Sequence, residues 1–264
     1  MIKICLDPGH GGNDRSNKGP TGYIEADGML DLVLKLRIEL ISTGAFEVLL
    51  TRDKDMSVGV RRRGEMAAEW KADMFISEHS NATGWSVNTT KTGSDVFYSV
   101  DLPGDKTLAN IFAKAVSESM GTKNNGGRTW ESKNYPGEDY LGVIDAAQDG
   151  GVPHIFLIEN GFHDHKDDEA KLKNPDIRTA IAKAQAKVIC EFYNVEYPKK
   201  EGIKMRELQQ WEKNVIDECI KKGIINQPEK WKNTPPDEKM SVINTLSMMN
   251  NLYNSIMNKI KEEK

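Results

Sequence analysis

The chain has 264 residues, of which 38% are hydrophobic and 29% are charged, and its formal net charge is −4. This length accommodates one large α/β domain with a small appendage, or two ordinary domains. The acidic balance argues against a general nucleic-acid binder, and the lack of an apolar run of about 18 residues argues against a membrane-spanning segment.

The start of the chain and its cysteines bear on the compartment in which it folds. A strand that begins at residue 2 leaves no room for a signal peptide, so we expect the protein to be made in the cytoplasm. The chain has three cysteines, which is an odd number, and their spacing matches no metal-binding or redox motif. They are Cys5, Cys190 and Cys219. We interpret them as buried free thiols, in preference to a disulfide or a metal role, which suits a reducing compartment.

Strand and helix patterns alternate from residue 1 to about residue 197. Alternating or continuous apolar residues predict strands at 2–6, 46–50, 74–77, 95–100 and 154–158. Apolar residues at helical spacing predict helices at 28–41, 58–70, 106–120 and 175–193. This alternation is typical of an α/β fold with a mostly parallel twisted sheet and helices on both faces.

The pattern changes after Tyr197. Residues 198–204 combine a proline with charged residues and a glycine, which is typical of a linker. Residues 205–264 carry only helical patterns and predict a small all-α module, with Trp211 and Val215 on the apolar face of its first helix. A unit of this size has a marginal core, so we expect it to dock on the first domain, to self-associate or to bind another molecule.

Polar side chains follow three of the predicted strands. His10 comes after the first strand in a glycine-rich turn, His79 follows the strand 74–77, and Glu159 follows the strand 154–158. The carboxyl ends of parallel strands meet at one edge of a sheet, so we expect these residues to lie close together, with Glu25 nearby. Two imidazoles and a carboxylate are typical ligands of catalytic zinc. Taken singly, a histidine at a strand end is more often a hydrogen-bonded structural group, and Glu25 resembles a surface carboxylate.

Glu159 ends a strongly apolar run at residues 155–158. Desolvation of its carboxylate costs free energy unless a cation or a proton offsets the charge. A nearby zinc ion would offset it, and the carboxylate could then take a proton from a zinc-activated water. The alternative interpretation is an acidic N-cap or a salt-bridge partner.

Five segments resemble, in the same order, the motifs of the zinc-dependent N-acetylmuramoyl-L-alanine amidases, a family that includes bacterial cell-separation enzymes and phage endolysins. They are DPGHGG at 7–12, GYIEAD at 22–27, TRD at 51–53, SEHSNA at 77–82 and IENGF at 158–162. The resemblance covers about residues 1–195 and implies a catalytic domain over residues 1–197. It also implies His10, Glu25 and His79 as Zn²⁺ ligands, Glu159 as the catalytic carboxylate and Arg63 as a structural residue.

The same resemblance implies a reaction and a setting. The substrate would be the amide between the lactyl group of N-acetylmuramic acid and L-alanine of the peptidoglycan stem, cleaved by a zinc-activated water. We expect a phage endolysin that acts at the cell wall after release through a holin pore, or a bacterial autolysin. A zinc peptidase that cuts within the stem peptide and a non-catalytic wall-binding protein are the alternatives. The oligomeric state stays open.

The chain departs from the family's pattern around the second histidine, where Glu78 and Ser80 replace an apolar residue and an alanine. Because side chains alternate along a strand, we expect Glu78 to point away from the face that carries His79. His163 and His165 lie outside the family's ligand set. Either could contact the substrate, but we expect both to be exposed loop residues.

Two further segments carry open alternatives. Residues 124–137, with Arg128, Trp130 and Tyr135, predict a loop that either lines a substrate groove or is solvated. The segment 205–264 faintly resembles one S-layer-homology repeat, a helical unit that binds cell-wall polymer. Wall binding and a docking or dimerisation hairpin are both compatible with it.

Overall fold

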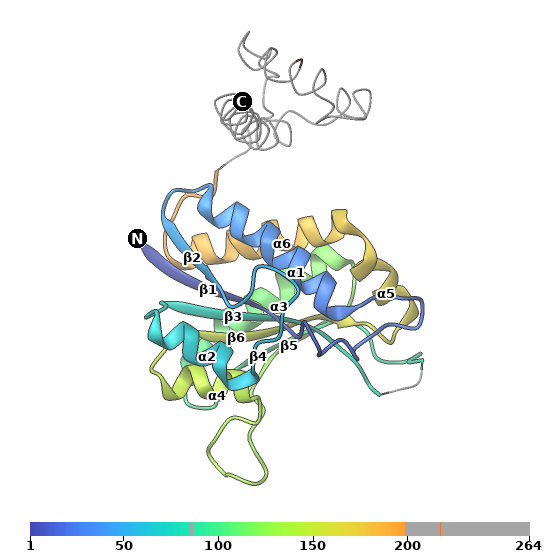
Figure 1. The fold of residues 1–264 in the computed structure, drawn as a ribbon, viewed down its shortest axis with the longest axis horizontal. Coiled ribbons are helices and arrows are strands. Elements are labelled where there is room, and N and C mark those ends of the chain that lie inside the picture. Colours follow the sequence, from blue (N-terminus) through green and yellow to red (C-terminus); the bar gives the residue numbers. More distant parts are fainter. Residues whose placement is uncertain (85–86, 199–216, 218–264) are drawn as a thin grey trace, which may run out of the picture. The chain divides into compact units, whose positions relative to one another are not determined.

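The computed structural model describes residues 1–84, residues 87–198 and Asp217. Of the predicted linker 198–204 and helical module 205–264, only residues 198 and 217 fall within this part of the chain. The described part is built around one six-stranded sheet with helices against it (Figure 1).

The sheet is mostly parallel, as predicted. Its strands are β1 (Ile2–Pro8), β2 (Phe46–Leu50), β3 (Met74–Asn81), β4 (Ser94–Tyr98), β5 (Asn124–Arg128) and β6 (Ile155–Phe162), in the spatial order β2-β1-β3-β6-β4-β5. Strand β1 pairs in parallel with β2 and β3, β3 pairs in parallel with β6, and β4 pairs in parallel with β5. The pair β4–β6 is antiparallel.

Helices cover both faces of the sheet, which confirms the predicted fold class. They are α1 (Glu25–Ile41), α2 (Val60–Glu69), α3 (Lys106–Met120), α4 (Gly142–Asp149), α5 (Lys166–Lys173) and α6 (Pro175–Phe192), with a 3-10 turn at Pro103–Asp105. Helices α1, α3 and α6 lie against one face, and α2 and α4 lie against the other (Figure 1). Phe112 and Phe156 are buried in the first layer, and Phe75 and Leu157 in the second. Burial on both faces explains why the central strands are continuously apolar.

Residues 124–128 form strand β5, although their sequence predicts a loop. The run NNGGR has no apolar alternation, and the strand lies at the edge of the sheet, paired only with β4 among the described strands. Helix α3 approaches it closely, because a Cβ at Gly127 would lie 2.6 Å from the Cβ of Ala109. The sequence pattern also fails to predict α4 and α5, and it ends β6 at residue 158 instead of Phe162. Tertiary contacts, rather than local pattern, form these elements.

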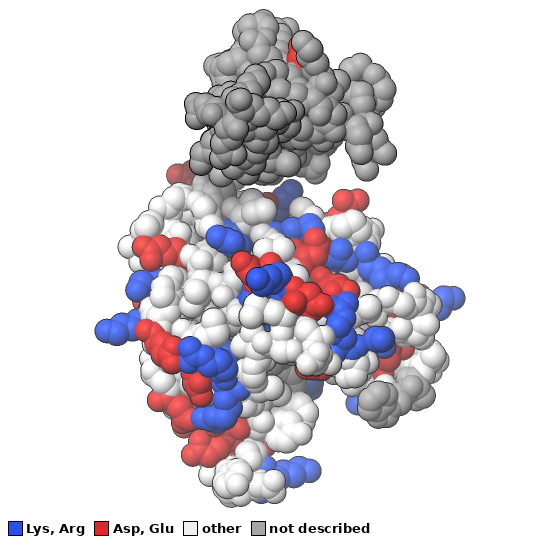
Figure 2. Space-filling model, viewed as in Figure 1, with Lys and Arg blue, Asp and Glu red and all other residues white. Residues whose placement is uncertain are grey.

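The described surface mixes both signs of charge. Figure 2 shows basic and acidic side chains interspersed across this face, without a field of one sign. On α2, for example, Arg62 lies 2.5 Å from a carboxylate oxygen of Glu69. Basic and acidic side chains on this helix therefore lie close enough to form ion pairs.

Two further expectations concern the cysteines and membrane-spanning segments. Cys5 and Cys190 are buried free thiols, as predicted, whereas Cys219 lies outside the described residues. Across residues 1–84 and 87–198, none of the helices combines the length and apolar character needed to cross a membrane.

Candidate metal centre

Strand β1, helix α1 and strand β3 bring His10, Glu25 and His79 together. Each of the three residues offers one ligand atom, and these atoms all lie within 4.8 Å of one another. His10 follows β1, Glu25 is the first residue of α1, and His79 lies near the end of β3. Because β1 and β3 are adjacent and parallel, their carboxyl ends emerge side by side. The sheet topology therefore gathers residues that are far apart in the sequence.

The glycine-rich turn after β1 determines how the two imidazoles approach each other. His10 has a φ of 58°, a left-handed conformation that costs a non-glycine residue about 1 kcal/mol or more. Gly9 leaves space for the second ring, because a Cβ at this position would lie 2.4 Å from Cε1 of His79. The rings of His10 and His79 meet edge to face, with their centroids 5.0 Å apart.

Asp14 orients the imidazole of His10. Its Oδ2 lies 2.7 Å from Nδ1 of His10. A carboxylate only accepts hydrogen bonds, so Nδ1 carries a proton and Nε2 is the nitrogen that faces the centre, 3.4 Å from Oε1 of Glu25. Asp14 is not predicted from the sequence, although an acidic residue four positions after a candidate ligand is a usable signal.

Glu25 is buried between the two histidines. Its Oε1 accepts a hydrogen bond from the backbone N–H of Ser80 at 2.8 Å and lies 3.1 Å from Nδ1 of His79. Burial would raise the pKa of Glu25, but hydrogen bonds and charge from His10 and His79 outweigh burial and hold it well below its ordinary value. For His10, burial acts to lower the pKa. Hydrogen bonds and negative charge from Glu25 and Asp14 outweigh burial and raise the pKa of His10 to about 9.

The donor set fits a zinc ion. Two imidazole nitrogens and one carboxylate oxygen are typical of catalytic zinc, and three protein ligands leave a coordination position for water or substrate. The second oxygen of Glu25, Oε2, is buried without a hydrogen-bond partner among the described residues. A buried, unpartnered carboxylate oxygen is a group that a cation would satisfy.

Glu159 lies beside this centre on strand β6. In the sheet it is paired with His79 of β3 on one side and with Asp95 of β4 on the other. Its Oε2 atom is buried and has no hydrogen-bond partner within the described part of the chain. Burial, followed by the negative charges of Glu25 and Asp95, raises the pKa of Glu159 well above its ordinary value. A buried carboxyl group with a raised pKa beside a proposed metal site is a candidate for proton transfer.

Arg63 braces the turn that carries His10. It donates hydrogen bonds to Oδ1 of Asp7 at 2.8 Å and to the carbonyl oxygens of Pro8 and His10 at 2.7 and 2.8 Å. Asp7 is completely buried, so this guanidinium also provides its counter-charge. These contacts are structural, which is the role expected for Arg63.

Arg52, from the TRD segment, makes a second brace. It donates to the carbonyl oxygens of Pro8, Gly9 and Ala26 at 2.9, 2.8 and 2.8 Å. Ala26 follows Glu25 in helix α1, so Arg52 ties the His10 turn to the helix that supplies the carboxylate. This role is not predicted from the sequence.

Glu78 lies on the side of β3 away from the metal centre, as predicted. Its Oε2 accepts a hydrogen bond of 2.6 Å from Nδ2 of Asn160, and the same amide nitrogen lies 3.6 Å from Sδ of Met29 in helix α1. Burial raises the pKa of Glu78 to about 7, with Asn160 acting in the opposite direction. Glu78 therefore belongs to the layer beneath α1.

The expectation that His163 and His165 are exposed is wrong. His163 is only 5% exposed, and its Nδ1 lies 2.9 Å from the carbonyl oxygen of Ser80 and 3.8 Å from Oε2 of Glu25. His165 is half-buried. The sequence predicts a loop after residue 158, but β6 continues to Phe162 and α5 begins at Lys166, which turns this short connection inward.

Comparisons with known proteins find similar chains. A family model described as N-acetylmuramoyl-L-alanine amidase matches residues 4–191. The sporulation-specific N-acetylmuramoyl-L-alanine amidase of Bacillus subtilis (strain 168) is 28% identical over 206 residues, which are 77% of this chain and 72% of that protein. The endolysin of Bacillus phage SPP1 is 30% identical over 201 residues, 75% of this chain and 68% of that protein.

A solved structure is similar over the same region. It is the catalytic domain of CwlV, an N-acetylmuramoyl-L-alanine amidase from Bacillus (Paenibacillus) polymyxa var. colistinus. The identity is 26% and the TM-score is 0.62, over 74% of this chain and 100% of that chain.

Proposed function

This chain belongs to the N-acetylmuramoyl-L-alanine amidase family, and we propose that it is a zinc enzyme that hydrolyses the amide between N-acetylmuramic acid and L-alanine in peptidoglycan. His10, Glu25 and His79 would hold the ion. The observation that carries the proposal is the convergence of these three ligand atoms next to the carboxylate of Glu159, whose Oε2 atom is buried.

The chemistry divides between the ion and the protein. When bound, zinc polarises the amide carbonyl and lowers the pKa of water at its open position. Glu159 moves the proton: its carboxylate takes a proton from the attacking water and returns it to the nitrogen of the departing L-alanine. Its position opposite His79 and its raised pKa support this double role.

Other side chains hold the ligands in place. Asp14 fixes the tautomer of His10, so that the lone pair of Nε2 faces the ion. The backbone N–H of Ser80 holds one oxygen of Glu25. Arg52 and Arg63 donate hydrogen bonds to the backbone of the turn that carries His10. This turn is therefore held in place, and little reorganisation is needed when substrate binds.

The proposal can be tested by identifying which bond of peptidoglycan the enzyme cleaves. Purified cell walls treated with the zinc-loaded enzyme should release new amino groups of L-alanine, without new reducing sugar ends. Reducing ends would identify a glycosidase and contradict the proposal. Mass spectrometry of the products separates an amidase from the zinc peptidase alternative, because a peptidase leaves L-alanine attached to muramic acid.

For the biological setting, we propose a phage endolysin that reaches the cell wall through a holin pore. The SPP1 endolysin among its relatives supports this assignment, while the sporulation-specific amidase supports the autolysin alternative. Expression of the chain in a susceptible bacterium, with and without a co-expressed holin, distinguishes them. Lysis that requires the holin supports the endolysin, and lysis without it counts against this route.

Residues 205–264 are proposed to bind a cell-wall polymer, with dimerisation as the alternative. The support is the sequence pattern alone, since this segment lies outside the described residues. Sedimentation with purified walls should retain the full chain more strongly than a chain that ends at residue 198. Equal retention of both chains, together with a dimer of the full chain in light scattering, would favour the alternative.

A further inference from the structure

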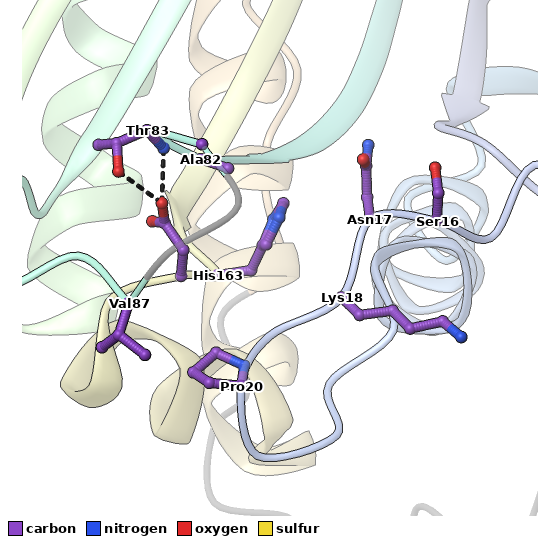
Figure 3. A pocket seen from close by; sticks show the side chains of 10 residues that line it. Ser16, Asn17, Lys18, Pro20, Ala82, Thr83, Val87 and His163 are labelled. Atoms are coloured by element: carbon purple, nitrogen blue, oxygen red, sulfur yellow. Dashed lines mark hydrogen bonds between the residues drawn. The ribbon is translucent and has the colours of Figure 1, made fainter.

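A pocket of about 380 Å³ opens beside the metal centre (Figure 3). Residues from three segments line it: the loop before α1, the loop after β3, and the connection between β6 and α5. Two contacts join the pocket to the proposed ligands. Nδ2 of Asn17 lies 2.9 Å from Nε2 of His10, and Nδ1 of His163 lies 3.8 Å from Oε2 of Glu25. A pocket of this size next to a reactive centre is typical of a binding site for part of a substrate.

Both walls of the pocket are fastened to buried acidic side chains that follow β6. Oδ2 of Asp164 accepts hydrogen bonds from the backbone N–H and the hydroxyl of Thr83 at 2.6 and 2.7 Å. Oε1 of Glu169 accepts from the backbone N–H groups of Thr21 and Tyr23 at 2.8 and 3.1 Å. Thr83 on one side and the segment from Thr21 to Tyr23 on the other are therefore held in place before a ligand arrives, which reduces the entropic cost of binding.

His163 stands between these walls. Figure 3 shows its ring directed between Ala82 on one side and Asn17 on the other. Its Nδ1 lies 2.9 Å from the carbonyl oxygen of Ser80 and 3.0 Å from the hydroxyl oxygen of the same residue. The carbonyl oxygen only accepts hydrogen bonds and the hydroxyl oxygen can accept as well, so a proton on Nδ1 satisfies both contacts. The lone pair is then on Nε2, which can accept a hydrogen bond from an N–H group of a ligand.

The remaining lining has the chemistry of a site for a short acidic peptide. Lys18 is an exposed lysine at the edge of the pocket, and Figure 3 shows its side chain extending away from His163. The carboxylate of Asp164 already accepts hydrogen bonds from Thr83. Pro20 and Val87 add small apolar surfaces. A peptide offers backbone N–H groups for an imidazole acceptor, carboxylates for a lysine and small side chains for such apolar surfaces.

We propose that this pocket binds the stem peptide on the L-alanine side of the cleaved amide. Lys18 pairs with a carboxylate of the peptide, and Nε2 of His163 accepts a hydrogen bond from a peptide N–H. This assignment rests on the proposed amidase function. It adds that the stem peptide contacts Lys18 and His163, which lie outside the metal centre.

Binding of a synthetic tripeptide tests the role of Lys18. The probes are L-alanyl-γ-D-glutamyl-L-lysine, whose glutamyl unit carries a free α-carboxylate, and the same tripeptide with that carboxylate converted to an amide. In NMR titrations of the full zinc-loaded chain, both should shift the amide signals of Asn17, Thr83 and Val87. Lys18→Met should weaken binding of the first probe roughly fivefold and leave the second unchanged. Lys114→Met, at an exposed lysine of α3, should change neither.

Two substitutions at His163 separate substrate contact from structure. His163→Asn keeps an N–H toward the Ser80 carbonyl but removes the acceptor at the Nε2 position, whereas His163→Gln places an amide oxygen near that position. His163→Asn should weaken both tripeptides about tenfold and raise KM for a muramoyl peptide by a similar factor. It should leave the zinc content unchanged, and His163→Gln should recover part of the loss.

The results distinguish this inference from the proposed function. An enzyme that releases L-alanine amino groups from walls, but whose Lys18→Met and His163→Asn variants bind the tripeptide as tightly as the wild type, overturns the pocket assignment alone. Shifts at Asn17, Thr83 and Val87 caused by the wall disaccharide instead of the tripeptide overturn it too. A protein that binds the tripeptide in this pocket but releases no amino groups supports the pocket assignment and contradicts the amidase proposal.

Discussion

His79 and Glu159 are paired across the parallel strands β3 and β6, at the point where the register of the two strands begins to shift. Up to this pair the ladder is regular, and the next matched residues are Asn81 and Phe162. Such a bulge bends the strands and redirects the side chains next to it. The separation between a proposed zinc ligand and the proposed proton carrier is therefore set by hydrogen-bonded strands, which position groups more accurately than loops do.

Replacement of Glu159 by glutamine should abolish most activity and leave metal binding intact. Glutamine has nearly the same shape but cannot take a proton from water, and the loss of a general base typically costs about 10²–10⁴-fold in rate. We expect kcat on purified walls to fall within this range, while the zinc content measured on the purified variant stays at that of the wild type. Glu138→Gln, at an exposed residue, serves as the matched control. Normal wall cleavage by Glu159→Gln would remove Glu159 from the mechanism.

Asp14→Asn should weaken zinc binding. The carboxylate that accepts from Nδ1 of His10 at 2.7 Å makes this imidazole a stronger ligand and fixes its tautomer. Loss of such a partner typically costs about 10–100-fold in metal affinity. Competition with a chromophoric chelator measures the affinity directly, and saturating zinc should restore much of the activity. Asp53→Asn, after the TRD segment, is a control of the same chemistry. If Asp14→Asn binds zinc as tightly as the wild type and Asp53→Asn do, then Asp14 does not support His10.

The sequence was sufficient to predict the positions of the site residues that follow apolar strands. It was insufficient to predict the burial and the secondary structure of the segments around them. His10, His79 and Glu159 could be placed at one edge of the sheet, because strand pattern and parallel topology determine where strands end. Glu25 required the resemblance to a family, since nothing local distinguishes it from a surface carboxylate. The burial of His163 depends on how far β6 extends and where α5 begins, and both follow from long-range contacts. Strand β5 was missed for the same reason: its run NNGGR gains its conformation from pairing with β4.

Arg63→Leu should destabilise the fold. The substitution leaves the fully buried carboxylate of Asp7 without its cationic partner and removes donors from the carbonyls of Pro8 and His10. Removal of one member of a buried ion pair typically costs about 3–5 kcal/mol. Urea unfolding monitored by circular dichroism should show this loss, and Arg63→Lys, which keeps the charge but not the geometry of the guanidinium, should recover part of it. A loss below about 1 kcal/mol would contradict the bracing role.

The free energy of unfolding should depend on pH through Glu78. Its pKa is raised by burial from 4.5 to about 7 in the folded protein, so the folded state binds more protons than the unfolded state between these values. Stability should therefore be greatest below pH 4.5, as far as this group is concerned, and fall as pH rises to about 7, by at most about 3 kcal/mol. Glu78→Gln retains an acceptor for Asn160 and should remove this slope. Denaturant unfolding from pH 5 to 8, with a chelator present so that metal binding does not contribute, measures both proteins. Parallel curves for the two would show that Glu78 titrates normally.

Gly9→Ala should displace His79 and weaken the metal centre without any change in ligand chemistry. A Cβ at residue 9 would lie 2.4 Å from Cε1 and 2.7 Å from Nδ1 and Nε2 of the His79 ring, well inside van der Waals contact. The ring cannot simply rotate away, because Nδ1 faces Glu25 at 3.1 Å and the backbone of β3 is held by β1 and β6. We expect zinc affinity to fall by about tenfold or more, a loss comparable to that of a ligand's supporting partner. Gly84→Ala, at a glycine with open space around the position of the added methyl group, controls for the loss of a glycine, although its own φ of 153° adds some strain. Zinc affinity in Gly9→Ala equal to that of the wild type would mean that the two histidines tolerate a wider separation than the turn imposes, and the tight packing of the His10 turn would then have no part in metal binding.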